Sequence, residues 1–415
     1  MSAPSSASES ARYEQHSGSP SANLLRTRGV DGSSKVTNIE LFFDLVFVYA
    51  VTQLSHTLLH GLNLLGTLQV LLLFLAVWWV WVFTSWVTNW LDPERPVVRL
   101  ALLTLMLAGM LLSIALPDAF GSRGLLFAGA YVFMQVGRTL FTLWALGNAA
   151  PANTRNFQRI TVWLVISGSL WLTGGWLDGQ LRWLLWVIAL ALEYAGPALA
   201  FPVPGMGRSS TADWNIDGGH LAERCSQFVL IALGESVLVT GSSFAETSWQ
   251  SQTTLAFVSA FIGSVAMWWI YFDLGAERGS RSIQQSADPG RTARVAYTYL
   301  HLLIVAGIIV CAVADELTLH APGQLSDPTG AAVLLGGPVL YLLGNALFKK
   351  TVNGTNLPLS HLIGLALLAV LVSAIGHWSI ATLGMATTLV LVLVALWEMC
   401  SLRGLRQSLA NEDAC

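Results

Sequence analysis

Charged side chains are scarce in this sequence: Asp, Glu, Lys and Arg make up 11% of its 415 residues. Average soluble domains carry about 25% charged residues. Here hydrophobic residues reach 54% and the mean hydropathy is +0.60. A soluble protein of this length would need more polar surface, so the composition excludes a secreted domain and most cytosolic enzymes. The net charge of −3 gives no reason to expect a nucleic-acid partner.

Cysteine and the common catalytic motifs are also sparse. The four cysteines, Cys225, Cys311, Cys400 and Cys415, form no C-x-x-C pair and no zinc spacing. No P-loop, GxGxxG, HExxH or GxSxG motif occurs in a suitable context, so nucleotide hydrolysis and serine or zinc hydrolysis have no support. The sequence therefore predicts no cofactor.

Long apolar runs are what the sequence does contain. A helix of about 20 apolar residues spans a bilayer core. Twelve such runs occur, at residues 37–60, 65–90, 98–117, 124–147, 159–177, 182–202, 220–243, 254–274, 295–314, 329–348, 358–376 and 379–400. We predict an all-α polytopic transmembrane bundle of about 12 spans, preceded by a disordered cytoplasmic tail over residues 1–35.

The lysines and arginines predict the orientation of this bundle. With the N-terminus inside, 17 of the 21 basic residues fall in inside segments, and only Arg123 and Arg182 fall outside. Cytoplasmic segments carry the excess of Lys and Arg in membrane proteins. Both termini are therefore expected in the cytoplasm.

The two halves of the chain share ordered similarities. Trp78-Trp79 matches Trp268-Trp269 at an offset of 190 residues, residues 108–118 match 306–316 at 198, and Glu40 aligns with Glu223 at 183. These matches predict two parallel six-helix repeats, at residues 36–203 and 220–400, with a cytoplasmic linker at 204–219 and a C-terminal tail at 401–415. Binding sites of such proteins lie between the halves.

Nine charged residues lie inside the predicted spans: Glu40, Asp44, Arg138, Glu193, Glu223, Arg224, Glu235, Asp273 and Glu398. A charge at a helix centre costs about 2.5–3.5 kcal/mol on insertion scales, so such residues are usually paired or functional. Glu40 and Asp44 stand one turn apart on one face of the first span. Glu398 is expected at the membrane interface.

The seventh span carries the densest polar face: His220, Glu223, Arg224, Gln227, Gly234 and Glu235. Arg224 suits a carboxylate partner, for which Glu40 and Asp44 are the candidates. This pairing could serve bundle packing alone. Glu235 lies near the bilayer centre and needs a partner or a proton. Glu235, Glu223 and Asp44 are the candidate proton donors or acceptors.

A pair of histidines and a pair of tryptophans can each be interpreted as functional or as structural. His56 and His60 stand one turn apart and are weak candidates for a metal pair, but no third ligand is evident nearby, so no metal site is predicted. Trp78 and Trp268 either pack in the bundle or line a binding site for a cationic or unsaturated ligand.

Two motifs resemble those of the bacterial low temperature requirement protein A (LtrA) family. One is the run Glu40-Leu-Phe-Phe-Asp44-Leu-Val-Phe-Val, and the other is His220-Leu-Ala-Glu223-Arg224 followed by Ala232-Leu-Gly-Glu235-Ser. The resemblance covers about residues 36–400. It implies a multi-spanning protein of the bacterial cytoplasmic membrane, and it implies no substrate or reaction.

The sequence favours a secondary transporter whose site combines Glu40, Asp44, His220, Glu223, Arg224, Gln227, Glu235, Trp78 and Trp268. A membrane-embedded enzyme, such as an acid-initiated cyclase, isomerase or transferase, is the alternative. An ion channel is a third hypothesis. The expected partners are the bilayer, a small-molecule, lipid or ion ligand, and further copies in a homo-oligomer.

Overall fold

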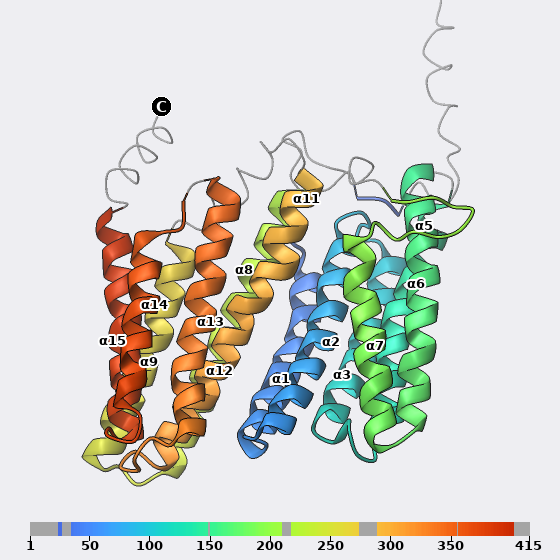
Figure 1. Cartoon of the computed structure of the whole chain (residues 1–415). Helices are drawn as coiled ribbons and strands as arrows, with labels where there is room; N and C mark the ends of the chain where they lie inside the picture. Colours follow the sequence, from blue (N-terminus) through green and yellow to red (C-terminus); the bar gives the residue numbers. More distant parts are fainter. Residues whose placement is uncertain are drawn as a thin grey trace, which may run out of the picture.

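A computed structural model describes residues 24–26, 35–147, 150–209, 217–273, 289–354 and 356–401. Across these residues the chain is helical, and the only strand-like pairings are isolated bridges. The helices stand side by side in one bundle (Figure 1). The all-α prediction is therefore confirmed.

The first half of the chain forms α1 (Asn38–His60), α2 (Leu64–Thr88), α3 (Pro96–Ala115) with η3 (Leu116–Asp118), α4 (Gly124–Val132), η4 (Phe133–Gly137), α5 (Arg138–Leu146), α6 (Pro151–Trp176) and α7 (Gly179–Ala198). The second half forms α8 (Gly218–Glu246), α9 (Ser251–Phe272), α11 (Pro289–Ala293), η6 (Arg294–Leu300), α12 (His301–His320), α13 (Pro328–Asn353), α14 (Leu359–Leu371) with η7 (Val372–Ala374), and α15 (Ile380–Ser401).

Each predicted span coincides with a helical segment, but the segments differ in their fitness to cross a membrane. Ten are long and apolar enough for a span, including α4 to α5 taken as one segment. The other two are α6, and the shorter α14 with η7, which covers residues 359–374. The chain is a multi-pass membrane protein, and the count of twelve spans stays a prediction.

Local sequence signals explain where many helices begin and end. Asn63 caps α2 by accepting a hydrogen bond from the Gly66 backbone N–H, and Asp327 caps α13 in the same way. Proline occupies the first turn of α3, α6 and α13, where its missing N–H costs nothing. Gly354 ends α13 with a φ of 62°, a left-handed conformation that favours glycine.

The helix containing α12 is longer than its apolar pattern predicts. The predicted span stops at residue 314, because Asp315 and Glu316 follow it. The structure continues α12 to His320, since neighbouring helices bury this last turn. Asp315 and Glu316 therefore lie inside a candidate membrane span, although the apolar run in the sequence ends before them.

Two spans contain π-helical turns, which the hydrophobic pattern does not predict. One is η4 between α4 and α5, and the other is η6 at the start of α12. π-Turns occur frequently at functional sites. The η6 turn lies where the halves meet, because the backbone carbonyl of Thr298 accepts a 2.7 Å hydrogen bond from the indole of Trp78 on α2.

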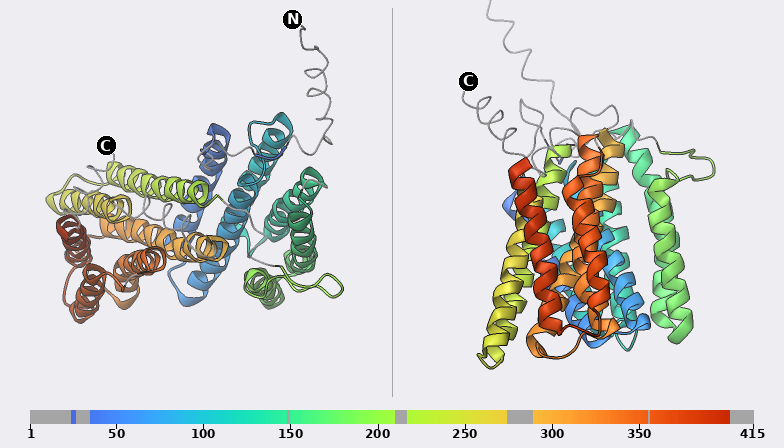
Figure 2. Two further views of the ribbon diagram at one scale, coloured as in Figure 1. Left: turned by 90° about the horizontal axis from the view of Figure 1, so that it is seen from above. Right: turned by 60° about the vertical axis from the view of Figure 1, so that its left-hand side comes forward.

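The two halves occupy opposite sides of the bundle (Figure 1) and are seen as two groups of helices from above (Figure 2). In the first half α1 packs on α2 and α3, α3 on α4, α4 on α6, and α6 on α7. In the second half α8 packs on α9 and α12, α12 on α13, α13 on α14, and α14 on α15. The neighbours therefore follow the same order in both halves. The halves meet chiefly through α1 and α2 of the first and α8 and α12 of the second.

Part of the predicted disordered tail is packed on the bundle. Leu24 is buried, and backbone hydrogen bonds join residues 24–26 to residues 90–92 after α2. The tail prediction is wrong for these three residues, because pairing with another segment orders them. Residues 1–23, 27–34 and 402–415 of the predicted tails, and 210–216 of the predicted linker, lie outside the described residues.

Close packing of α12 on α13 depends on glycine, and two adjacent glycines provide a matched test. A Cβ at Gly337 would lie 2.7 Å from Cys311 Sγ and 2.8 Å from the Cys311 backbone nitrogen, whereas a Cβ at Gly336 meets nothing within 4 Å. Small residues let membrane helices approach closely. We expect Gly337→Ala to lower stability by about 1–3 kcal/mol through overpacking, measured as a fall in Tm of the purified protein. Gly336→Ala should leave Tm unchanged, and an equal effect of both substitutions would contradict this assignment.

Candidate functional site

The first helices of the two halves, α1 and α8, pack against each other in parallel and bring four polar residues together. Glu40 and Asp44 lie one turn apart on α1, and His220 and Arg224 lie one turn apart on α8. All four side chains are fully buried. We call this group the seam cluster.

Arg224 contacts both carboxylates of the seam cluster. Its Nη2 lies 2.6 Å from Asp44 Oδ1, and its Nη1 lies 3.4 Å from Glu40 Oε1. Glu40 Oε1 also lies 2.8 Å from His220 Nε2. The predicted pairing of Arg224 with Glu40 or Asp44 is confirmed, and the arginine bridges the two acids instead of forming a fork with one of them.

The other oxygen of Glu40 ties the start of the chain to the seam cluster. Arg26 Nη2 donates to Glu40 Oε2 over 2.9 Å, and the backbone N–H and the hydroxyl of Thr37 donate to the same oxygen at 2.9 Å each. The Thr37 contacts form a capping box that begins α1. Glu40 therefore both starts the helix and holds the buried charges together.

Helix α2 supplies a second set of contacts around these charges. The Trp81 indole donates to Asp44 Oδ1 over 2.7 Å, and Arg224 donates to Ser85 Oγ over 3.3 Å. Asn89 Oδ1 accepts from the Asp217 backbone N–H, so its amide nitrogen is the group facing His220 Nδ1 at 3.4 Å. Because Nδ1 then accepts, Nε2 carries the proton and donates to Glu40.

With neutral His220, two guanidinium groups balance two carboxylates in this region. Arg26 and Arg224 face Glu40 and Asp44. The hydrogen bonding is nevertheless incomplete, since Asp44 Oδ2 and Arg224 Nε have no hydrogen-bond partner among the described residues. Buried groups left this way are unusual and call for an explanation.

The polar face predicted for the seventh span is divided by packing. His220 and Arg224 are buried, whereas Glu223 and Gly234 are exposed and Gln227 is half-buried. Glu223 accepts from the Val36 backbone N–H at 3.3 Å and from Gln227 Nε2 at 3.4 Å. Glu223 and Gln227 are therefore not members of the seam cluster.

Glu235 lies further along the same seam. Eleven residues separate it from Arg224, which places it about 16 Å along the helix on nearly the same face. The half-buried Glu235 carboxylate accepts a short hydrogen bond from the Thr52 hydroxyl of α1. The polar contacts between α1 and α8 thus continue from Glu40 to Thr52.

The structure separates the two candidate tryptophans. Trp78 is buried and packs edge-to-face against Phe228 and at a tilt against Trp81, whereas Trp268 on α9 is 42% exposed. They do not form one aromatic wall. The difference arises because α2 is more enclosed by other helices than α9. Of the apolar 18-residue stretch in each helix, 83% is buried in α2 and 44% in α9.

The two candidate metal-binding histidines do not converge on a site. His60 is exposed, and its Nδ1 lies 2.8 Å from the backbone oxygen of His56. No group of three or more His, Cys, Asp or Glu side chains suited to a metal ion occurs among the described residues. The weak metal hypothesis gains no support.

Three polar features of the structure are absent from the sequence-based site. Glu193 accepts four side-chain hydrogen bonds from α4, η4 and α6. Glu398 is buried and pairs with Lys349 at 2.6 Å, and its position at the membrane interface stays a prediction. Asp315 lines a cavity between four helices of the second half. Glu193 and Glu398 count among the charged residues inside predicted spans. Asp315 does not, because the predicted span ends at residue 314.

Together these features define an all-α, multi-pass membrane protein with buried charges where its two halves meet. The family model of the bacterial low temperature requirement A protein (LtrA) matches residues 35–396, so the chain belongs to the LtrA family. It is 42% identical over 401 residues to Uncharacterized protein RA0937 of Rhizobium meliloti (strain 1021), an alignment that covers 96% of this chain and 97% of that protein. No solved structure matches the chain significantly.

Proposed function

We propose that the chain is a secondary transporter whose two six-helix halves move relative to each other about the α1–α8 seam. In this proposal the halves are parallel repeats related by a pseudo-two-fold axis along the membrane normal. The equal order of helix neighbours in the two halves supports a duplication. So does the parallel pairing of α1 with α8, where Glu40 meets His220 and Asp44 meets Arg224, each 180 residues apart.

The observation that carries this proposal is the placement of buried charge at the interface between the halves. A static core gains little from such pairs, since apolar residues of similar volume are often equally stable. Charged pairs can instead exchange partners when packed elements shift between discrete arrangements. Arg224 already contacts two acids, and the unpaired Asp44 Oδ2 offers a further acceptor to an incoming ligand.

The orientation belongs to the same proposal. Helix α1 begins and α15 ends at the same end of the bundle (Figure 1), as an even number of crossings requires. The excess of lysine and arginine in the segments on that side supports a cytoplasmic location for this end, in the inner membrane of a bacterium. The seam cluster then lies in the cytoplasmic half of the bilayer, with Glu235 deeper.

Glu235 is the residue that we propose couples transport to protons. A half-buried carboxyl held by one hydroxyl can take up and release a proton without breaking an ion pair. In proteoliposomes, a pH gradient should drive uptake from a panel of labelled metabolites and ions. Glu235→Gln should lower the gradient-driven uptake at least tenfold, because the amide cannot carry the proton.

Thr52→Val is the matched control, since it removes the hydrogen bond to Glu235 but keeps the carboxyl. This variant should retain coupled uptake. Absence of flux for the whole panel in wild-type proteoliposomes would argue against a transporter. Single-channel currents without a coupled gradient would support a channel instead, and a product change in lipid extracts between wild type and Glu235→Gln would support an enzyme.

A further inference from the structure

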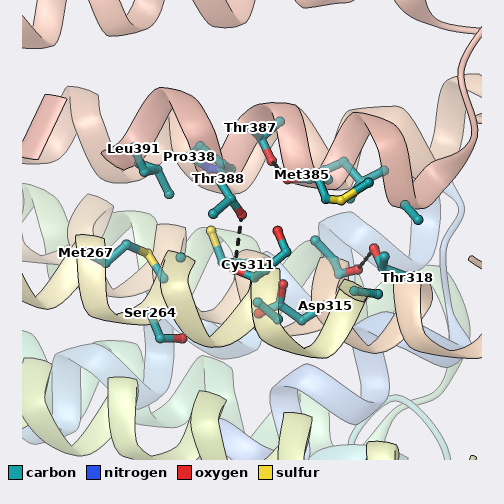
Figure 3. Close-up of a pocket in the computed structure, with 18 residues that line it drawn as sticks. Ser264, Met267, Cys311, Asp315, Thr318, Pro338, Met385, Thr387, Thr388 and Leu391 are labelled. Atoms are coloured by element: carbon teal, nitrogen blue, oxygen red, sulfur yellow. Dashed lines mark hydrogen bonds between the residues drawn. The ribbon is translucent and has the colours of Figure 1, made fainter. Parts of the chain in front are cut away.

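A cavity lies inside the second half of the molecule, away from the α1–α8 seam. Helices α9, α12, α13 and α15 line it, and water-sized molecules have about 30 Å³ of space inside it (Figure 3). A single water needs about 10–15 Å³ by this measure. The space therefore admits two or three waters or a small ion.

Asp315 is the only charged side chain that lines this cavity. It forms no hydrogen bond and no ion pair with any residue that the structure describes, and no lysine, arginine or histidine joins it in the lining. Asp315 is half-buried within a candidate membrane span. A carboxylate without a partner in such a span is costly unless it is neutralised by a proton or by a cation. The fold therefore places an uncompensated acid next to an internal space.

The other polar groups around the cavity present mainly acceptor atoms. Thr318, Thr387 and Thr388 donate their hydroxyl hydrogens to backbone carbonyl oxygens over 2.7, 2.8 and 3.4 Å. Each hydroxyl oxygen therefore faces its surroundings with lone pairs only. Ser259 and Ser264 add two more hydroxyl groups to the lining. Oxygen acceptors around one carboxylate suit a hard cation and disfavour an anion.

We propose that this cavity binds a small monovalent cation such as Na⁺, with Asp315 as its charged ligand and the threonine hydroxyls as neutral ligands. A single carboxylate matches a single positive charge. A calcium site draws on several carboxylate or carbonyl oxygens at six to eight positions, whereas Asp315 is the single carboxylate in this lining. The proposal does not depend on transport, since binding can be measured on purified protein.

Glycine keeps the cavity open and offers a way to close it. A Cβ at Gly384 would lie 3.5 Å from both Thr318 Oγ1 and Leu334 Cδ2, which is ordinary van der Waals contact. Gly384→Ala therefore fits the fold while it fills part of the space beside a proposed ligand. Asp315→Asn removes the charge with little change of shape.

The test is the thermal stability of the purified full-length protein in NaCl, with choline chloride keeping the ionic strength constant. A ligand that binds only the folded state raises Tm saturably. We expect a saturable rise of several degrees for wild type, no rise for Asp315→Asn, and a weaker response for Gly384→Ala. Glu316→Gln is the control, because it neutralises the next residue of α12, a buried acid outside the cavity lining, and should respond as wild type does.

Three results would overturn the proposal. Wild-type stability could be the same in NaCl and choline chloride at a pH where Asp315 is ionised, the response could fail to saturate with NaCl, or the same response could persist in Asp315→Asn. If Asp315→Asn does not fold, binding of ²²Na⁺ to wild type and to Gly384→Ala decides. Saturable binding that Gly384→Ala weakens at least tenfold supports the site, and no binding refutes it.

Discussion

Arg224→Met should largely abolish folded protein. The substitution leaves the carboxylates of Glu40 and Asp44 buried close together without Arg224. Glu40 keeps one arginine partner, Arg26, and Asp44 keeps none. Removing one partner of a buried charge pair costs about 3–5 kcal/mol, because the other charge stays desolvated. Here two acids lose the same partner. We expect little monodisperse protein on size-exclusion chromatography after detergent extraction, and a much lower Tm for what is recovered.

Arg99→Met is the matched control for this experiment. Arg99 pairs with Glu94 at 2.9 Å, the same length as many buried contacts, but both side chains are exposed. Exposed ion pairs contribute about 0–1 kcal/mol, so this variant should behave as wild type does. Arg224→Lys should rescue only in part, since a point charge cannot reach both acids as a guanidinium does. A wild-type Tm for Arg224→Met would show that the seam cluster does not hold the halves together.

Glu193→Ala should have the second large effect. The buried carboxylate accepts hydrogen bonds from Tyr131 at 2.5 Å, Gln135 at 3.0 Å, and Ser167 and Trp171 at 2.9 Å each. These donors come from three different elements, α4, η4 and α6, and α7 supplies the acceptor. Each buried donor left without a partner costs about 1–3 kcal/mol. The expected loss of stability is therefore about 3 kcal/mol or more, measured as a fall in Tm.

Glu193→Gln distinguishes the charge of this residue from its role as an acceptor. The amide keeps one acceptor oxygen, so the variant should fall between wild type and Glu193→Ala. Glu94→Gln, at an exposed acid, should leave Tm unchanged. Tryptophan fluorescence should shift in Glu193→Ala, because Trp171 loses its hydrogen bond. Equal Tm values for Glu193→Ala and wild type would contradict a structural role.

The last helix of the second half, α15, also carries a buried acid that contacts neighbouring helices. Glu398 on α15 pairs with Lys349 on α13 at 2.6 Å and lies 3.5 Å from His361 on α14. Glu193 on α7 likewise contacts two other helical segments, the one formed by α4 and η4 and the one formed by α6. The sequence marked both acids as intramembrane charges but could not say what either one contacts, since their partners are different residue types in the two halves.

The sequence by itself determined the fold class, the helix positions and the residue types of the seam cluster. Long apolar runs fix helices because a bilayer core leaves backbone groups no other partner, and the turn residues Asn63, Asp327 and Gly354 mark their ends. The scarcity of charge also made the buried acids visible, and it correctly suggested that Arg224 meets Glu40 and Asp44.

Only the tertiary structure decided which polar residues meet. Periodicity places His220, Glu223 and Arg224 on one broad face, but the position of α1 turns His220 and Arg224 inward and leaves Glu223 exposed. In the same way, Trp78 and Trp268 occupy similar sequence contexts, and only the enclosure of α2 buries one of them. Asp315 lies just past an apolar run, and the packing of α9, α13 and α15 against its own helix α12 makes it part of a cavity lining. Helix formation depends on local sequence, whereas burial and pairing depend on neighbours that the local sequence does not specify.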